Sequence, residues 1–177
     1  ATNRVHLGVA VLDEKLYVVG GIGLKSAEVY DPTMKSWSPI AKMNSPRQGL
    51  GVAVLRGKLY ALGGNGLKSA EVYNTINNSW SDIKSMKFTR MGLAVAVLQG
   101  KLYALGGYEG SSYLDTVEVY DPSASNPKWS PGASMKSKRY GLGVAVLQGK
   151  IYALGGKDGS SSYLNSVEMY DPSAGKW

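Results

Sequence analysis

The chain has 177 residues, a net charge of +7 and no cysteine, which excludes disulfides, thiolate metal sites and cysteine nucleophiles. Its single histidine excludes a two-histidine metal site within the chain. No apolar run reaches the ~18 residues of a membrane span, and the N-terminal residues do not have the pattern of a signal peptide. We therefore expect one folded domain without a membrane segment, and the lack of cysteine favours the cytoplasm.

The sequence repeats itself four times. The segment GVAVLDEKLYVVGG at 8–21 returns, with few changes, at 51–64, 94–107 and 143–156, and such self-similarity indicates a repeat architecture. An arginine opens each unit, a glutamate recurs in its second half and a tryptophan closes it. These residues are Arg4, Arg47, Arg90 and Arg139; Glu28, Glu71, Glu118 and Glu168; and Trp37, Trp80, Trp129 and Trp177. We predict a single domain over 1–177, with repeats at approximately 4–46, 47–89, 90–138 and 139–177.

Each unit is expected to form four short strands. The VAVL segment is apolar at every position, as in a strand buried on both faces. A two-residue turn such as Arg56-Gly57 leads to a second strand, KLYAL, which ends in two glycines. The EVY segment is the third strand, and an Asp-Pro pair ends it. The segment that begins at the tryptophan is the fourth strand, so the last unit, which stops at Trp177, lacks most of its outer strand.

The combination of an opening arginine, VAVL-x-G-K-L-Y-A-L-G-G, E-V-Y-D-P and a tryptophan resembles the kelch repeat, most closely in the BTB–BACK–kelch adaptor proteins of ubiquitin ligases. This resemblance implies an all-β propeller with one four-stranded antiparallel blade per repeat and the first strand innermost. Kelch propellers commonly have six blades, so four repeats predict a partial propeller. The terminal blades of such an arc would expose apolar faces, and we expect either self-association to close the ring or a strained closure of the four blades on themselves.

Loops carry function on a rigid repeated scaffold. The connections from second to third strand, and from fourth strand to the next unit, should share one face, here called the loop face. Twelve basic residues, including the four opening arginines, fall on it against three acidic residues. The candidate partner-binding residues on this face are His6, Lys25, Arg47, Lys68, Arg90, Tyr108, Tyr113, Lys136, Lys138, Arg139, Tyr140 and Tyr163. We expect this face to attract an acidic protein or peptide.

Two alternatives apply to these candidates. The arginines can instead be structural, bound to carbonyl groups between blades. Tyr113 and Tyr163 can fold back onto their own blades, which makes Tyr108 and Tyr140 the better candidates for exposure. The resemblance also implies that the position two after each arginine contacts substrate, but here it holds His6 and three glycines.

The sequence favours a non-catalytic protein-interaction module, with neither catalytic residues, a metal nor a cofactor expected. By resemblance, the partner would be a substrate delivered for ubiquitination. An actin-binding, cytoskeleton-associated protein is the alternative. Nucleic acid and membrane are not expected as partners, because the basic residues follow the repeat rather than a binding motif.

Overall fold

The computed structural model describes residues 2–160 and 162–177, which form fifteen strands and no helix. The strands make four antiparallel sheets, in the orders β1-β2-β3-β4, β5-β6-β7-β8, β9-β10-β11-β12 and β13-β14-β15. Blade 1 contains β1 (Gly8–Leu12), β2 (Lys15–Val19), β3 (Ala27–Asp31) and β4 (Ser36–Ile40). Blade 2 contains β5 (Gly51–Leu55), β6 (Lys58–Leu62), β7 (Ala70–Asn74) and β8 (Ser79–Ile83). Blade 3 contains β9 (Ala94–Leu98), β10 (Lys101–Leu105), β11 (Val117–Tyr120) and β12 (Trp129–Pro131), and blade 4 contains β13 (Gly143–Leu147), β14 (Lys150–Leu154) and β15 (Val167–Tyr170).

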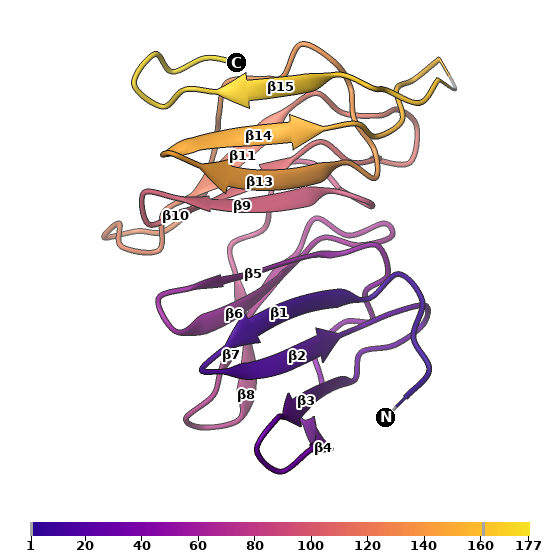
Figure 1. Cartoon of the computed structure of the whole chain (residues 1–177), viewed down its shortest axis with the longest axis vertical. Coiled ribbons are helices and arrows are strands. Elements are labelled where there is room, and N and C mark those ends of the chain that lie inside the picture. Colours follow the sequence, from indigo (N-terminus) through magenta and orange to yellow (C-terminus); the bar gives the residue numbers. More distant parts are fainter. Residues whose placement is uncertain (1, 161) are drawn as a thin grey trace.

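This is the predicted propeller of four blades, of which the last has three strands. The inner strands β1, β5, β9 and β13 follow one another, and the sheets fan out from them (Figure 1). The linkers that enter each inner strand and the loops after β2, β6, β10 and β14 lie at one end of the strands, at the right in Figure 1. The predicted loop face is therefore a continuous surface of the molecule.

The core lies between the blades. Because side chains alternate across a strand, each sheet contributes one set of apolar residues to the next blade and another to the preceding blade. Between blades 1 and 2, for example, Leu12, Tyr17 and Val19 pack against Leu59 and Trp80. Two further clusters repeat this arrangement between blades 2 and 3 and between blades 3 and 4.

Two glycine positions show why the repeat tolerates little change. Gly63, the first glycine of the pair after β6, has φ +64°, and a Cβ there would lie 2.5 Å from the carbonyl oxygen of Arg90. The turn between β5 and β6 places Arg56 and Gly57 at φ 52° and 67°, the left-handed pair of a tight hairpin. In blade 1 the corresponding turn holds Asp13 and Glu14, at φ 48° and 60°.

This difference predicts a stabilising substitution. Glu14 adopts a left-handed backbone that costs an ordinary residue about 1 kcal/mol, and the other three units have glycine there. We expect Glu14→Gly to raise the free energy of unfolding by about 0.5 kcal/mol, after the larger entropy of the unfolded glycine chain is deducted. Urea denaturation measures this, and the reciprocal Gly57→Glu variant should be less stable than the parent. A loss of stability in Glu14→Gly would contradict the assignment of strain to this turn.

Candidate functional site

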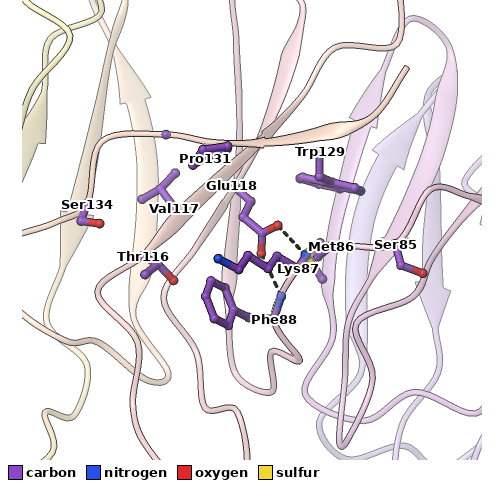
Figure 2. Close-up of a pocket in the computed structure, with 11 residues that line it drawn as sticks. Ser85, Met86, Lys87, Phe88, Thr116, Val117, Glu118, Trp129, Pro131 and Ser134 are labelled. Atoms are coloured by element: carbon purple, nitrogen blue, oxygen red, sulfur yellow. Dashed lines mark hydrogen bonds between the residues drawn. The ribbon is translucent and has the colours of Figure 1, made fainter. Parts of the chain in front are cut away.

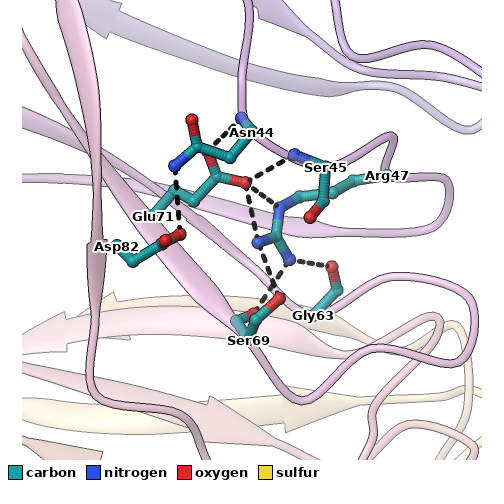
Figure 3. A network of polar contacts seen from close by, with 7 residues as sticks. All are labelled: Asn44, Ser45, Arg47, Gly63, Ser69, Glu71 and Asp82. Carbon is teal, nitrogen blue, oxygen red and sulfur yellow. Dashed lines mark hydrogen bonds and ion pairs between the residues drawn. The ribbon is translucent and has the colours of Figure 1, made fainter.

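A buried arginine anchors each linker on the loop face. Arg47 directs all five of its N–H groups to partners: the Glu71 carboxylate, the carbonyls of Gly63 and Ser69, and the hydroxyl of Ser69. Its Nη2 lies 2.9 Å from Oε1 of Glu71, and both side chains are fully buried. Glu71 in turn accepts the backbone N–H of Asn44, as Figure 3 shows.

The same network recurs in the next two repeats. Arg90 pairs with Glu118, at 3.0 Å, and Arg139 with Glu168, at 3.1 Å. Each of these arginines also makes five hydrogen bonds and is completely buried. A guanidinium has five N–H donors, so no donor remains for a partner. Arg47, Arg90 and Arg139 are therefore scaffold residues, and the expectation that they contact a partner is corrected.

Pairing with glutamate also changes the charge of the loop face. The arginine charges are neutralised at short range, which leaves the lysines to set the potential. Eight lysines belong to this face, against the three carboxylates of Glu109, Asp115 and Asp158. They are Lys25, Lys42, Lys68, Lys84, Lys87, Lys136, Lys138 and Lys157, of which all but the half-buried Lys157 are exposed.

Blades 3 and 4 bring a cluster of tyrosines together on the loop face. The ring of Tyr113 lies 5.3 Å from that of Tyr108 and stacks on that of Tyr140 at 5.5 Å, between centroids. Tyr108 and Tyr140 meet edge to face at 6.4 Å. We call these three residues the tyrosine cluster; all three are half-buried. Such pairs fix the rings in place while leaving their outer surfaces available for contact.

Backbone pairing holds the loops of the tyrosine cluster. Tyr108 exchanges two hydrogen bonds with Met91, at 2.8 and 3.0 Å, and Tyr140 does the same with Lys157. The Glu168 carboxylate accepts the N–H groups of Lys136 and Ser137, at 2.6 and 3.0 Å, on the linker that ends at Tyr140. The surface is therefore positioned by the buried network beneath it.

Two hollows flank Tyr113. One, of about 450 Å³, is lined by Tyr113, Tyr140, Lys157 and Tyr163, and Lys157 lies over the ring of Tyr163. The other, of about 320 Å³, is lined by Tyr108, Tyr113 and Lys138. Each hollow thus combines aromatic walls with a lysine. Lys157, which the sequence placed on the loop face but not among the candidate contacts, belongs to this site.

The sequence favoured Tyr108 and Tyr140 as the exposed tyrosines, and the structure differs from this expectation. Tyr163 is 85% exposed, whereas Tyr108 is half-buried and donates its hydroxyl to the carbonyl of Gly110. The alternative that Tyr163 packs back is therefore wrong. Its counterpart Tyr113 is half-buried because it stacks on Tyr140 of the next repeat, a contact that no local pattern encodes.

The other candidates lie apart from the tyrosine cluster. Lys25 and Lys68 are on the short loops of blades 1 and 2, and Lys136 borders a separate hollow with Met169 and Trp177. His6 begins a chain of backbone hydrogen bonds that continues through the three glycines at equivalent positions. Those glycines have φ of 61–65°, so the left-handed backbone explains why these positions hold glycine.

A further hollow lies between blades 2 and 3. It has a volume of about 470 Å³ and is lined by Phe88, Trp129, Lys87 and the buried Glu118, among others (Figure 2). Glu118 accepts the N–H groups of Lys87 and Phe88 there. Between blades 1 and 2, Asn44 and Asp82 hydrogen-bond to each other at the equivalent place (Figure 3). The sequence did not predict this hollow, because Phe88 is a change at a single position of the repeat.

A family model described as the Kelch motif matches residues 3–44, 46–87, 89–136 and 138–177. The chain belongs to the kelch-repeat family. Kelch propellers act as protein-interaction scaffolds, and the surface described above is compatible with this role. Within the described residues, no three His, Cys, Asp or Glu side chains are grouped so as to hold a metal ion, and no helix could cross a membrane.

The matches to individual proteins support less than the match to the family does. An F-box/kelch-repeat protein of Arabidopsis thaliana is 43% identical over 49 residues, which cover 23% of this chain and 10% of that protein. The structure of YjhT superimposes with a TM-score of 0.80 at 17% identity, over 93% of this chain and 63% of that one. The second comparison shows the fold alone. The chain thus spans less than two thirds of either protein.

The buried pairs predict a large difference between two substitutions. Arg90→Ala would leave Glu118 buried without its cation, which costs about 3–5 kcal/mol. Lys101→Ala removes an exposed partner of Asp121 and is expected to leave the denaturation midpoint almost unchanged. Urea denaturation of the two variants compares them directly. Similar losses in both would contradict the structural role of Arg90.

The Arg139–Glu168 pair also predicts how stability depends on pH. Burial by itself raises the pKa of Glu168, but the N–H of Lys136 and the guanidinium of Arg139 lower it by more, so the pKa lies below its ordinary 4.5. The folded state then binds this proton more weakly than the unfolded state. The resulting stabilisation is complete above pH 4.5 and is lost as the pH falls through the lower, folded pKa.

We therefore expect Glu168→Gln to melt at a lower temperature than the parent at pH 7 and to approach the parent at pH 3. Thermal melts followed by circular dichroism across this range provide the measurement. Two melting curves that stay equally far apart at every pH would contradict the assignment.

Proposed function

We propose that this kelch propeller binds an acidic segment of a partner protein across the tyrosine cluster. The observation that carries the proposal is the placement of Lys138 and Lys157 in two hollows on either side of Tyr113. An acidic segment that crosses Tyr113 could place a carboxylate near each lysine and an apolar side chain on the rings. Aromatic residues held rigidly are efficient contact surfaces, because they lose little conformational entropy on binding.

The charge of the loop face supports an acidic partner over a neutral one. Exposed lysines produce a long-range attraction that raises the association rate, whereas the packed aromatic rings slow dissociation. The arginines of the loop face contribute little to this attraction, because glutamates neutralise their charges at short range. The lysines that remain after that pairing are therefore the origin of the proposed preference.

A role in ubiquitin-ligase substrate recognition rests on a weaker observation. The F-box/kelch-repeat relative combines a kelch region with an F-box in one protein, and the linkers of this chain resemble those of BTB–BACK–kelch adaptors. We propose that the bound segment belongs to a substrate for ubiquitination in the cytoplasm. The acidic surface of actin is the alternative partner for the same lysines, and cosedimentation with actin filaments distinguishes the two.

Substitutions in the site should affect binding in separable ways. For the tightest peptide selected from a Glu/Asp-rich display library, Lys138→Glu should reduce the association rate, more strongly at low salt. Tyr140→Ala should weaken affinity about tenfold through faster dissociation, as expected for a buried aromatic contact. Surface plasmon resonance at two salt concentrations measures both effects.

Lys58→Glu is the matched control, because Lys58 is an exposed lysine at the opposite end of the strands. It makes the same change in net charge and should have a much smaller effect. Equal effects of Lys58→Glu and Lys138→Glu, or the absence of any selected acidic peptide, would contradict the proposed site.

A further inference from the structure

The repeat changes at three positions around the hollow between blades 2 and 3. The residues at these positions are Asn44, Ser45 and Asp82 between blades 1 and 2, and Lys87, Phe88 and Pro131 between blades 2 and 3. The Asn44 amide donates to the Asp82 carboxylate at 3.2 Å and so joins the linker to the outer strand. Lys87 and Pro131 line the equivalent space, and a proline side chain has no group that accepts a hydrogen bond, so the hollow stays open.

Aromatic side chains form the walls of this hollow, which we call the interblade hollow. Phe88 stands where the repeat has serine and is half-buried. Trp129 packs against Tyr120, with 5.2 Å between ring centroids, and donates its indole N–H to the carbonyl of Lys84 at 2.8 Å. Figure 2 shows Phe88 and Trp129 on either side of Glu118. A planar apolar group that enters the hollow would meet walls already in place, which reduces the entropy lost on binding.

The charge that the interblade hollow offers to a ligand is positive. The Glu118 carboxylate is already paired, because it accepts the N–H groups of Lys87 and Phe88 and the guanidinium of Arg90. The ammonium group of Lys87 lies 5.1 Å from the centroid of the Phe88 ring and has no carboxylate partner among the residues that the structure describes. A ligand carboxylate beside this ring would accept a charge-assisted hydrogen bond from Lys87. An ammonium ligand would find no unpaired carboxylate among the lining residues.

We propose that the interblade hollow binds a small aromatic carboxylate, with its ring between Phe88 and Trp129 and its carboxylate beside Lys87. The hollow has a volume of about 470 Å³, within the ~300–1,000 Å³ of ligand pockets. None of the lining residues belongs to the tyrosine cluster. Binding here therefore goes beyond the function proposed above and can be tested independently of it.

Titration of the isotope-labelled 177-residue chain with phenylacetate, followed by NMR, tests the site. The indole N–H signal of Trp129 should shift and saturate, with a dissociation constant on the order of 1 mM for a ligand of this size. Phenethylamine carries an ammonium group on a similar ring and should bind about tenfold more weakly or worse, because Lys87 repels it. A Trp129 signal that does not saturate with phenylacetate, or equal binding of phenethylamine, would overturn the proposal.

Exchanging residues between the two blade interfaces tests what forms the hollow. The triple variant Lys87→Asn, Phe88→Ser, Pro131→Asp carries the residues found between blades 1 and 2. It should keep the fold and bind phenylacetate about tenfold more weakly or worse. Lys58→Glu makes the same change in net charge at the opposite end of the strands, so it is the matched control and should bind as the parent does. Undiminished binding in the folded triple variant would contradict the site.

The reciprocal exchange looks for a gain of binding. Asn44→Lys, Ser45→Phe and Asp82→Pro together recreate the hollow between blades 1 and 2, and blades 1 and 3 already have a proline at the last of these positions. Trp80 is the counterpart of Trp129, with its indole N–H bound to the equivalent linker. We expect phenylacetate to shift the signals of both tryptophans in this variant and that of Trp129 alone in the parent. A folded variant whose Trp80 signal stays fixed would refute the assignment to these three residues.

An aromatic carboxylate can be a free molecule or the C-terminal residue of a peptide. The peptide Gly-Gly-Phe presents a similar ring and carboxylate at a chain end, and its titration separates the two sources. Tighter binding than phenylacetate supports the site with a peptide terminus as its ligand, and weaker binding supports a free molecule. Failure of both ligands to bind would overturn the proposal.

A variant of the tyrosine cluster separates this site from the proposed partner site. Tyr140→Ala should leave the affinity for phenylacetate unchanged, because Tyr140 does not line the interblade hollow. A loss of phenylacetate binding in Tyr140→Ala, with Trp129 no longer shifting, would place the ligand on the tyrosine cluster and overturn the assignment to the hollow.

Discussion

The buried arginine–glutamate pair is the interaction on which the rest of the structure depends. In blade 2, Arg47 and Glu71 join a linker, a diglycine turn and the third strand of the sheet in one saturated network. Such a pair is costly to remove from water and is stable only when all its donors and acceptors are satisfied. Its repetition explains why loops without regular secondary structure form a defined face. It also removes the arginines from the set of groups that could contact a partner.

The loop face acquires its function where the repeats differ. Blades 1 and 2 have short loops after their second strands, whereas blades 3 and 4 insert extra residues that carry Tyr113 and Tyr163. Tyr113 stacks on Tyr140 from the intervening linker, and Tyr163 lines a hollow together with both. Binding surface is thus added to the scaffold without altering the strands beneath it. The potential of this surface comes from its lysines, because each arginine on it is paired with a glutamate.

The uncovered end faces follow from the same repetition. Each blade has two apolar faces because its inner strand is apolar at every position, and among the described residues the first and last blades use only one of these faces. Alternation along β1 puts Val9 and Val11 on the opposite side from Leu12.

The sequence by itself determined the four blades, their strands and the position of the loop face, because a period of two along a strand and a fixed repeat are local patterns. It also placed Tyr108, Tyr113 and Tyr140 on that face, but the structure alone showed that the three rings form one cluster. Only the tertiary structure decided that Arg47, Arg90 and Arg139 are buried, since their carboxylate partners lie 24–29 residues away. The stacking of Tyr113 on Tyr140 of the next repeat likewise depends on how blades pack rather than on neighbours along the chain, whereas Tyr163 stays exposed.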